Sequence, residues 1–566
     1  MDRISLGMNI GHDQGAAIVK NGKLIGAIAQ ERIDRVKHSY STQIPFAAID
    51  ALLGYCDLTI QNVDNFGFSS TAVNVEELRQ YVTDSLENQY GLTDIHLIPV
   101  AHHQAHAEST YFTSGFNNAV VLVADGGGEV VQSMEESESI FLCDGCNVKL
   151  VEQRLQSHHF HALHRPHNYI YPFMHKAWFN EQISLGKKYE QISNLLGFGG
   201  NGAGKVMGLA AYGTSLINVA PQKVLDPFDF ELSFSYILQE YYQLFEQSGE
   251  NYFQFMKKHN ADIARSMQDY TENQVVELID YMLKKYSNSR ICLAGGLFLN
   301  CPVNHKILER FPEVDLHICP AAGDDGQAMG TAFAAHRSLS LLIENSSSVL
   351  PYLGISYSDA QIEDAINARN LSYHRYSEEQ AATKVAKYIF DNKIVAFLHG
   401  RSEIGPRALC HRSILANPTN PDMKDYINAR VKHRENFRPF APVVTAEAQF
   451  TYFDLLRESP YMLLAAKVKD EYSGRLPAVT HVDDTARVQA VEKMSDPYMH
   501  TILTEFMKLS GLPVLLNTSF NDNGEPIIES PTDAIQTFLK TEIDVLVMET
   551  YILLKEDIDG YTPSGI

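Results

Sequence analysis

The sequence predicts an α/β protein in which a duplicated N-terminal domain is followed by a second α/β domain. Two segments, starting near residues 7 and 119, each place a polar, glycine-bearing loop directly after an apolar strand and precede helical stretches. Such strand–loop–strand units, repeated along one chain, indicate a duplicated α/β architecture. Beyond residue 350, helical and strand patterns alternate again, as in "AATKVAKYIFDNKIVAFLHG" and "GLPVLLNTSFN". A chain of 566 residues also exceeds one ordinary domain.

The first unit is "GMNIGHDQGAAIVKNGKLIGAIAQER", where Asp13 to Gly15 form a polar loop and Asn21-Gly22 predicts a type I′ hairpin. The second is "NAVVLVADGGGEVVQS", followed by "SIFLCDGCNVKLVEQRL". The C-x-x-C of Cys143 and Cys146 could be a redox pair or half a zinc site, but its central Asp-Gly favours a hairpin turn. Proteins of the actin, hexokinase and Hsp70 group are built from two such units, so we expect an actin-like domain.

The domain boundary is predicted where "SLLIENSSSVLPYLGISYSD" interrupts the helical pattern. Residues 1–348 then form the first domain and residues 349–566 the second.

Composition restricts the class of protein. With 45% hydrophobic and 20% charged residues and no apolar run near 20 residues, a cytoplasmic enzyme without a membrane span is expected. The net charge of −23 argues against general binding of nucleic acid. Seven scattered cysteines fit a reducing compartment.

Three histidines lie close together in "VAHHQAHAEST". On a helix, His102 and His106 stand one turn apart on one face, and His103 also neighbours His106. Two imidazoles supply only half of a four-ligand metal set, so the spacing leaves a metal site, a catalytic base and a polar helix face open.

Basic residues concentrate in "HGRSEIGPRALCHRSILANP" and "KHRENFRPFAPVV". The set comprises Arg401, Arg407, Arg412, Arg430, Lys432, Arg434 and Arg438. Guanidinium groups present a planar fork to phosphate oxygens, which favours a polyanion site over a surface network paired with Glu403 and Glu435. Further polar candidates follow strand-like runs: Arg487, Asn517, Ser519 and Asn521.

The N-terminal half has glycine-bearing loops of its own. "GFGGNGAGKVMGLAAYG" places Gly199, Gly200, Gly202 and Gly204 before Lys205 and a helix, although the spacing is not that of a Walker A loop. "CLAGGLFLNCPVN" offers Gly295, Gly296, Asn300 and Asn304 at a strand end, and "CPAAGDDGQAMG" offers Asp324 and Asp325. Three such strand ends predict a nucleotide cleft between two subdomains.

These motifs together resemble one family. "GHDQGAA", "HHQAHAEST", "DGGGE", "GKVMGLAAYG", "AGGLFLN", "GRSEIGPRAL", "KHRENFRPFAP", "HVDDTARVQ" and "NTSFN" occur in this order along the whole chain. They are similar to the O-carbamoyltransferases of natural-product and nodulation-factor pathways, including those of the saxitoxin type. The resemblance implies a Kae1-like actin-fold domain followed by a YrdC-like domain. It implies formation of carbamoyl-adenylate from carbamoyl phosphate and ATP, with Mg²⁺, and carbamoyl transfer to an alcohol.

The resemblance also assigns residues. It implies that His102 and His106 bind a catalytic metal with Asp125 and with Asp324, which fits the family's D-x-G-x-A spacing better than Asp325 does. Mixed nitrogen and oxygen ligands suit Fe²⁺ best, with Mn²⁺ or Zn²⁺ as alternatives. His12 corresponds to the family's active-site histidine and could accept the proton of the attacking hydroxyl. The alternative is a loop histidine that only hydrogen-bonds the backbone.

In the C-terminal domain, Lys432, Arg438 and Arg487 are expected to hold carbamoyl phosphate, with Arg407 and Ser519 assisting the nucleotide. One departure is Cys410, which replaces the glycine usual after "GPRAL". The alternatives are a tRNA threonylcarbamoyl-transfer enzyme, an actin-fold small-molecule kinase and a silent nucleotide-binding scaffold. The acceptor is expected to be a small cationic alcohol, such as a guanidinium alkaloid or aminoglycoside, and a homodimer is left open.

Overall fold

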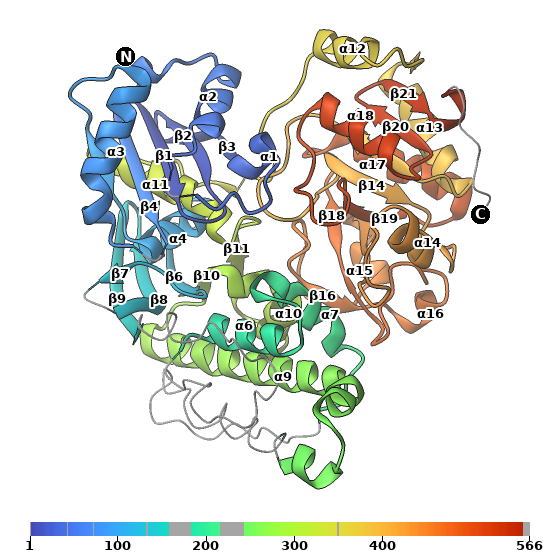
Figure 1. Ribbon diagram of the computed structural model, residues 1–566, viewed down its shortest axis with the longest axis horizontal. Coiled ribbons are helices and arrows are strands. Elements are labelled where there is room, and N and C mark those ends of the chain that lie inside the picture. The colour runs from blue at the N-terminus through green and yellow to red at the C-terminus, as the bar shows by residue number, and fades with distance from the viewer. Residues whose placement is uncertain are drawn as a thin grey trace.

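The computed structural model describes residues 2–41, 43–71, 73–131, 134–157, 183–215, 241, 243–347 and 350–558. The N-terminal domain, coloured blue to green in Figure 1, lies beside the C-terminal domain, coloured yellow to red. Among the described residues, no helix has the length and apolar character that crossing a membrane requires.

The first sheet has the strand order β3-β2-β1-β4-β5. Its strands are β1 (Ile4–Ile10), β2 (Gly15–Lys20), β3 (Lys23–Ala29), β4 (Asn65–Ser70) and β5 (Leu97–Pro99). The β1–β2 and β2–β3 pairs are antiparallel, whereas β4 and β5 continue parallel to β1. Asn21 and Gly22 join β2 to β3 with φ angles of 53° and 84°, as the predicted type I′ turn requires. Helices α1 (Gln30–Asp34), α2 (Phe46–Tyr55) and α3 (Val75–Tyr90) follow strands of this sheet.

The second sheet repeats this arrangement. Its strands are β6 (Asn118–Ala124), β7 (Val130–Val131), β8 (Met134–Asp144), β9 (Asn147–Ser157), β10 (Arg290–Ala294) and β11 (Asp315–Ile318). Strand β6 pairs antiparallel with β8 on one side and parallel with β10 on the other, as β1 does with β2 and β4. The duplicated α/β unit expected of an actin-like domain is therefore confirmed. The predicted hairpin turn between Cys143 and Cys146 is confirmed as well, and both thiols are free.

Helices pack between and beneath the two sheets. Helix α11 (Gln327–Ser338) packs against β1, β4 and α4 (His102–Tyr111). Four further helices support the second sheet: α6 (Leu185–Leu195), α7 (Ala203–Ala210), α9 (Tyr252–Tyr286) and α10 (Cys301–Arg310).

The contact between α11 and α4 depends on Gly330. A Cβ atom there would lie 1.8 Å from the carbonyl oxygen of Ala105 in α4. We expect Gly330→Ala to lower the free energy of unfolding by about 3 kcal/mol, because two packed helix backbones must separate. At Gly54 in helix α2, no atom lies within 4 Å of such a Cβ. Gly54→Ala should therefore raise the free energy of unfolding by about 0.5–1 kcal/mol, because alanine loses less backbone entropy than glycine in a helix. Denaturant titration of both variants measures the difference, and equal stabilities would contradict the close approach.

The C-terminal domain contains a mixed sheet of order β12-β21-β20-β13-β14-β19-β15-β18. Its strands are β12 (His374–Arg375), β13 (Val395–Leu398), β14 (Arg412–Ala416), β15 (Ala441–Thr445), β18 (Gln489–Val491), β19 (Val514–Ser519), β20 (Val545–Met548) and β21 (Tyr551–Leu554). A separate pair is formed by β16 (Ala465–Lys467) and β17 (Thr485–Arg487).

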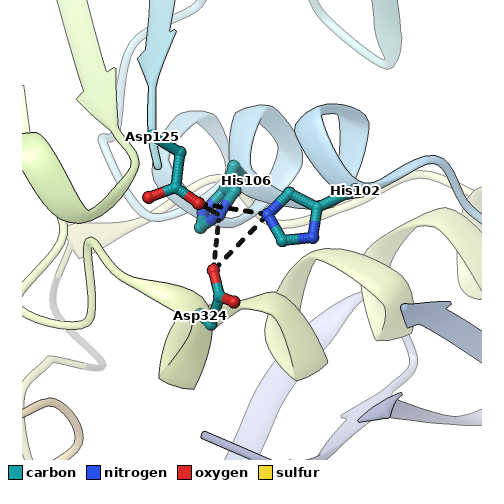
Figure 2. Close-up of side chains that lie close together, drawn as sticks. All are labelled: His102, His106, Asp125 and Asp324. Atoms are coloured by element: carbon teal, nitrogen blue, oxygen red, sulfur yellow. Dashed lines mark hydrogen bonds and ion pairs between the residues drawn. The ribbon is translucent and has the colours of Figure 1, made fainter. Parts of the chain in front are cut away.

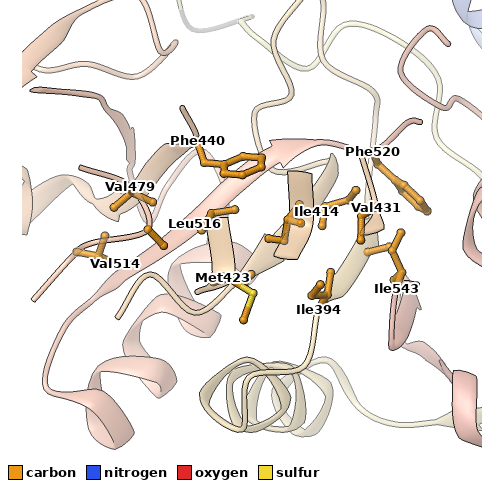
Figure 3. Close-up of a cluster of buried hydrophobic side chains, with 14 of the residues drawn as sticks. Ile394, Ile414, Met423, Val431, Phe440, Val479, Val514, Leu516, Phe520 and Ile543 are labelled. Atoms are coloured by element: carbon orange, nitrogen blue, oxygen red, sulfur yellow. The ribbon is translucent and has the colours of Figure 1, made fainter. Parts of the chain in front are cut away.

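Each face of this sheet is covered by its own helices. Helices α13 (Glu378–Phe390) and α17 (Pro497–Ser510) pack on one face. The other face is covered by α12 (Asp359–Asn367), α14 (Met423–Arg430) and α18 (Pro531–Lys540). Figure 3 shows the second core, where Ile414 and Leu516 of the sheet lie near Met423 of α14. The short helices α15 (Gln449–Tyr452) and α16 (Asp470–Ser473) lie at its edge. The predicted α/β class is thus confirmed for this domain too.

The predicted boundary between residues 348 and 349 lies outside the described residues. Just after it, Leu350 and Leu353 pack into a core of the N-terminal domain, and the Leu353 carbonyl accepts a hydrogen bond from the Ala27 amide at 3.0 Å. Helix α12 is the first element after this segment to pack into the C-terminal core.

Candidate active site

Four buried side chains converge between the two repeats of the N-terminal domain. His102 and His106 extend from one face of α4, Asp125 follows β6, and Asp324 lies in the turn before α11 (Figure 2). His102 Nε2 lies 3.2 Å from Asp125 Oδ2, and His106 Nε2 lies 3.1 Å from Asp324 Oδ1. One nitrogen or oxygen from each of the four residues lies within 4.8 Å of the others.

The charge state of this cluster suits a cation. Burial alone would raise the pKa of the Asp324 carboxyl, but the charges of His102 and His12 hold it well below its ordinary value. The pKa of Asp125 is lowered in the same way by the imidazoles of His102 and His106. Two ionised carboxylates and two imidazole nitrogens fit a divalent metal ion, because ligands about 2.1 Å from one ion lie roughly 3.4 Å apart.

Two neighbours of the cluster lie outside it. His103 points to Ser139, with Nδ1 2.7 Å from Oγ, and burial lowers its pKa. Asp325 is also not part of the four-residue group, and burial raises its pKa to about 8. The structure therefore brings together Asp324, the aspartate favoured by spacing, and not Asp325.

His12 lies at the edge of the cluster, in the loop after β1. Its Nε2 is 3.2 Å from Asp324 Oδ2 and its Nδ1 is 3.0 Å from Asp13 Oδ2. The carboxylate of Asp324 raises the pKa of His12 to about 9. A cation bound by Asp324 would offset that effect and favour the neutral imidazole that a general base requires.

Sequence reasoning missed His38. Its Nδ1 lies 2.8 Å from Asp13 Oδ1, so Asp13 bridges the two imidazoles of His12 and His38. No sequence motif in that loop indicated this contact, which depends on the loop after α1 folding back toward β1.

A second group of residues forms a cationic cluster, which we define as Lys37, Arg407, Lys432, Arg434, Arg438 and Arg487. Burial and the charge of Arg487 lower the pKa of Arg407 to about 9, and burial and Arg438 do the same for Arg434. The Nε atoms of Arg407 and Arg487 are buried without a hydrogen-bond partner among the described residues. Mutually repelling, incompletely paired cations indicate an anion site.

The cationic cluster includes one residue from the N-terminal domain. Lys37 was not predicted, but its pKa is lowered by burial and, among its charged neighbours, by Arg438. Lys205, which was predicted, also reaches this region and pairs with Glu435 at 2.7 Å. The cluster therefore lies where the two domains meet.

Lys432 differs from the arginines because its partners are already in place. Its ammonium donates to the backbone oxygens of Ser519 and Asn521 at 2.9 and 2.8 Å and to the Ser519 hydroxyl at 3.2 Å. Burial lowers its pKa well below the ordinary value. In this arrangement Lys432 fixes the end of β19 and the residues just after it, which include the predicted site residues Ser519 and Asn521.

Three basic residues of the predicted polyanion motif lie outside the cluster. Arg412 is fully buried and donates to the carbonyl groups of His399, Ile355 and Glu529. Arg401 likewise donates to the backbone carbonyl of Gly354 at 2.8 Å. Arg430 pairs at the surface with Glu542 at 2.9 Å.

The glycines and asparagines predicted at strand ends occupy mixed positions. The Gly296 amide donates to Asp125 Oδ1 at 2.8 Å, and Gly295 lies against the Ala124 backbone, so both shape the histidine–aspartate site. Asn300 accepts from the Val303 amide as the N-cap of α10. Asn304 donates to the Phe298 and Leu463 carbonyls.

The remaining predicted residues lie near the cationic cluster or in the elements that carry its side chains. Asn517 donates to Gln489 Oε1 at 2.8 Å, and Asn521 donates to the Glu525 carbonyl at 2.6 Å. Gly204 lies in the first turn of α7, one residue before Lys205. A cavity of about 280 Å³ beside Arg487 is lined by Arg265, Gln268, Glu272 and Asp483 among others, so it carries charges of both signs.

Cys410 adopts the backbone conformation for which glycine is favoured. Its φ angle is 84°, and its side chain is fully buried. Burial raises the pKa of its thiol well above the ordinary value, which disfavours a nucleophilic role. The substitution of the family glycine therefore keeps the left-handed turn at the cost of local strain.

Comparison with known proteins finds a matching family model in each half of the chain. Residues 89–333 match a family model described as carbamoyltransferase N-terminus, and residues 386–555 match one described as carbamoyltransferase C-terminus. An uncharacterized protein of Synechocystis sp. is 31% identical, over 96% of this chain and 95% of its own length. Nodulation protein NolNO of Sinorhizobium fredii is 31% identical, over 96% of this chain and 79% of its own length.

Similarity to solved structures is more distant. A crystal structure of full-length HypF in a phosphate- and nucleotide-bound form shares 15% identity and a TM-score of 0.42, covering 60% of this chain and 56% of that one.

An α/β chain that matches these family models and relatives is a transferase. The chain belongs to the carbamoyltransferase family, so the family and the enzyme class predicted from its motifs are confirmed.

Proposed function

We propose that the protein is an ATP-dependent O-carbamoyltransferase that divides its reaction between two sites. At the cationic cluster in a YrdC-like C-terminal domain, water would cleave carbamoyl phosphate to carbamate and inorganic phosphate. The carbamate oxygen would then attack the α-phosphorus of ATP and displace pyrophosphate, which gives carbamoyl-adenylate. The carbamoyl group would then pass to an alcohol at the histidine–aspartate site, releasing AMP. The observation that carries the proposal is the pairing, in one chain, of an incompletely paired arginine group with a buried His₂Asp₂ cluster.

The cationic cluster is suited to adenylation because its charges already face one another. The guanidinium groups of Arg407, Arg438 and Arg487 repel one another, and phosphate oxygens bound between them would relieve that repulsion. These groups would also stabilise the negative charge that develops while the adenylyl group is transferred. Lys432 would hold Ser519 and Asn521 in position for the nucleotide.

The histidine–aspartate site is suited to carbamoyl transfer. His102, His106, Asp125 and Asp324 would hold a divalent metal, for which Fe²⁺ is our choice over Mn²⁺ or Zn²⁺ and which would supply Lewis-acid polarisation of the carbonyl. His12 would accept the hydroxyl proton at Nε2, while Asp13 fixes the ring through Nδ1.

The reaction products test the proposal. Incubation with carbamoyl phosphate, ATP and a panel of alcohols should yield AMP, pyrophosphate, inorganic phosphate and a product heavier by one carbamoyl group. We expect cationic acceptors such as aminoglycosides or guanidinium alkaloids to react faster than neutral sugars, and added salt to raise their KM, because acidic residues exceed basic ones by 69 to 46.

Other outcomes would identify other functions. Release of ADP in place of AMP would indicate a small-molecule kinase, and carbamoyl-type transfer to tRNA would indicate a tRNA-modifying enzyme. Equal rates for neutral acceptors, with KM insensitive to salt, would remove the preference for cations but leave carbamoyl transfer intact.

A further inference from the structure

A second histidine–carboxylate cluster lies within the C-terminal domain, built from elements of that domain alone. It consists of His399, directly after β13, His411, directly before β14, and Asp496, the N-cap of α17. One nitrogen or oxygen from each of the three lies within 4.8 Å of the others. The backbone amide of His399 donates to the His411 carbonyl at 3.0 Å, so the β13–β14 pairing itself brings the two imidazoles together.

Each of the two imidazoles is held through its Nδ1 atom, which leaves Nε2 available. His411 Nδ1 lies 2.6 Å from the Arg401 carbonyl oxygen, which can only accept, so Nδ1 carries the proton. His399 Nδ1 lies 2.5 Å from Glu549 Oε2, whose other oxygen accepts from the Gly400 amide at 2.7 Å. In a neutral imidazole with Nδ1 protonated, Nε2 presents a lone pair. Histidine ligands of metal ions are held by outer-shell acceptors of this kind.

Two buried polar atoms of the cluster lie close to each other, but neither has a hydrogen-bond partner among the described residues. His411 is 6% exposed and Asp496 is 2% exposed. Asp496 Oδ1 accepts from the Met499 amide at 2.9 Å, but Asp496 Oδ2 and His411 Nε2 have no hydrogen-bond partner among the described residues. These two atoms lie 3.5 Å apart. Two lone pairs at that distance repel unless a positive charge lies between them.

We propose that His399, His411 and Asp496 form a binding site for a divalent transition-metal ion, with Zn²⁺ as the best match. Two imidazole nitrogens and one carboxylate oxygen are a ligand set that Zn²⁺ prefers, and water completes the tetrahedron. The 3.5 Å separation of His411 Nε2 and Asp496 Oδ2 is close to the roughly 3.4 Å expected of two ligands on one zinc ion. The side chain of His399, 21% exposed, leaves a route for the ion.

The ion would join three elements at one end of the C-terminal sheet. It would fix the end of β13, the start of β14 and the first turn of α17. Tyr352 stacks on His411 with ring centroids 3.5 Å apart and an interplanar angle of 6°, and its hydroxyl donates to the Leu409 carbonyl at 2.9 Å. The site would therefore also hold the segment that leads out of the N-terminal domain.

Zinc binding to the full-length protein tests the proposal. The metal-free wild-type protein should bind two equivalents of Zn²⁺, one at each histidine–aspartate group, and zinc should raise its Tm. Asp496→Asn keeps Oδ1 as the helix cap but weakens the ligand, so it should lose one equivalent, with affinity lowered by about a hundredfold or more. The His102→Ala/His106→Ala variant should lose the other equivalent and keep this one.

Two further variants keep the test decisive. If Asp496→Asn does not fold, the partly exposed His399→Gln removes a ligand with less effect on the core. Glu549→Gln, which alters only the acceptor behind His399, should weaken zinc by roughly 10- to 100-fold without removing the site. One equivalent in the wild type that disappears in His102→Ala/His106→Ala would overturn the proposal. Two equivalents in both folded ligand variants would overturn it too, and a protonated His411–Asp496 pair would then be the explanation.

Discussion

The double variant His102→Ala/His106→Ala should lose bound metal and carbamoyl transfer, yet still release pyrophosphate when given ATP and carbamoyl phosphate. Both imidazoles belong to the four-residue cluster, and neither residue is part of the cationic cluster. Loss of Lewis-acid stabilisation worth several kcal/mol lowers transfer by on the order of a thousandfold. Metal content, pyrophosphate and carbamoylated product should be measured side by side on the same preparation.

His103→Gln is the matched control for this variant. His103 lies on the same helix and is equally buried, but it contacts Ser139 and lies outside the cluster. It should perturb α4 to a similar degree while retaining metal and transfer, and thermal melting checks that each variant folds. Full transfer activity in a folded double variant would refute the metal assignment. Loss of pyrophosphate release as well would refute the division into two sites.

Replacing Arg438 with alanine should greatly reduce pyrophosphate release but leave the bound metal in place. Its guanidinium is one of the mutually repelling cations of the cationic cluster, and the charge of Glu435 only partly offsets the burial that lowers its pKa. Removing a donor to the reacting phosphate should reduce pyrophosphate release by roughly a hundred- to a thousandfold. Product formation should fall in parallel, because no adenylate is formed, whereas the metal content should be unchanged.

Arg430→Ala is the control for charge alone. Arg430 comes from the same basic stretch of sequence but pairs with Glu542 at the surface, so both activities should remain within about twofold of the wild type. Arg438→Lys keeps the charge without the planar fork and should recover part of the lost rate. Unchanged pyrophosphate release in Arg438→Ala would show that this group does not contact the phosphate.

Local sequence patterns were sufficient to predict the duplicated fold because hairpins and buried strands are local features. The Asn21-Gly22 turn and the Asp-Gly turn between Cys143 and Cys146 determine how β2–β3 and β8–β9 pair, whatever lies elsewhere. The YrdC-like character of the second domain rests on family resemblance, and its mixed sheet order could not be read from periodicity.

The candidate site was less accessible to sequence reasoning because it depends on tertiary burial. Arg412 and Arg438 look equivalent in a basic motif, yet one is bonded to backbone carbonyls in the core and the other faces like charges. Lys37 and His38 reach their positions only because a loop of the first repeat folds toward the domain junction. A lysine such as Lys432 is expected to bind phosphate, but its ammonium donates instead to the backbone oxygens of Ser519 and Asn521.

The duplicated unit has a consequence for how the site could diverge. His12 lies two residues after the end of β1, and Asp125 directly follows β6, so both residues lie in the loops that leave corresponding strands of the two repeats. Asp324 lies close to both loops: it is 3.2 Å from His12 Nε2, and His102 and His106 contact both Asp324 and Asp125. In the proposed mechanism, the loop of the first repeat would supply the proton acceptor and the loop of the second a metal ligand. The repeated strand pairing of the backbone is therefore not matched by the side chains of the two loops, because one carries an imidazole toward Asp324 and the other a carboxylate toward His102.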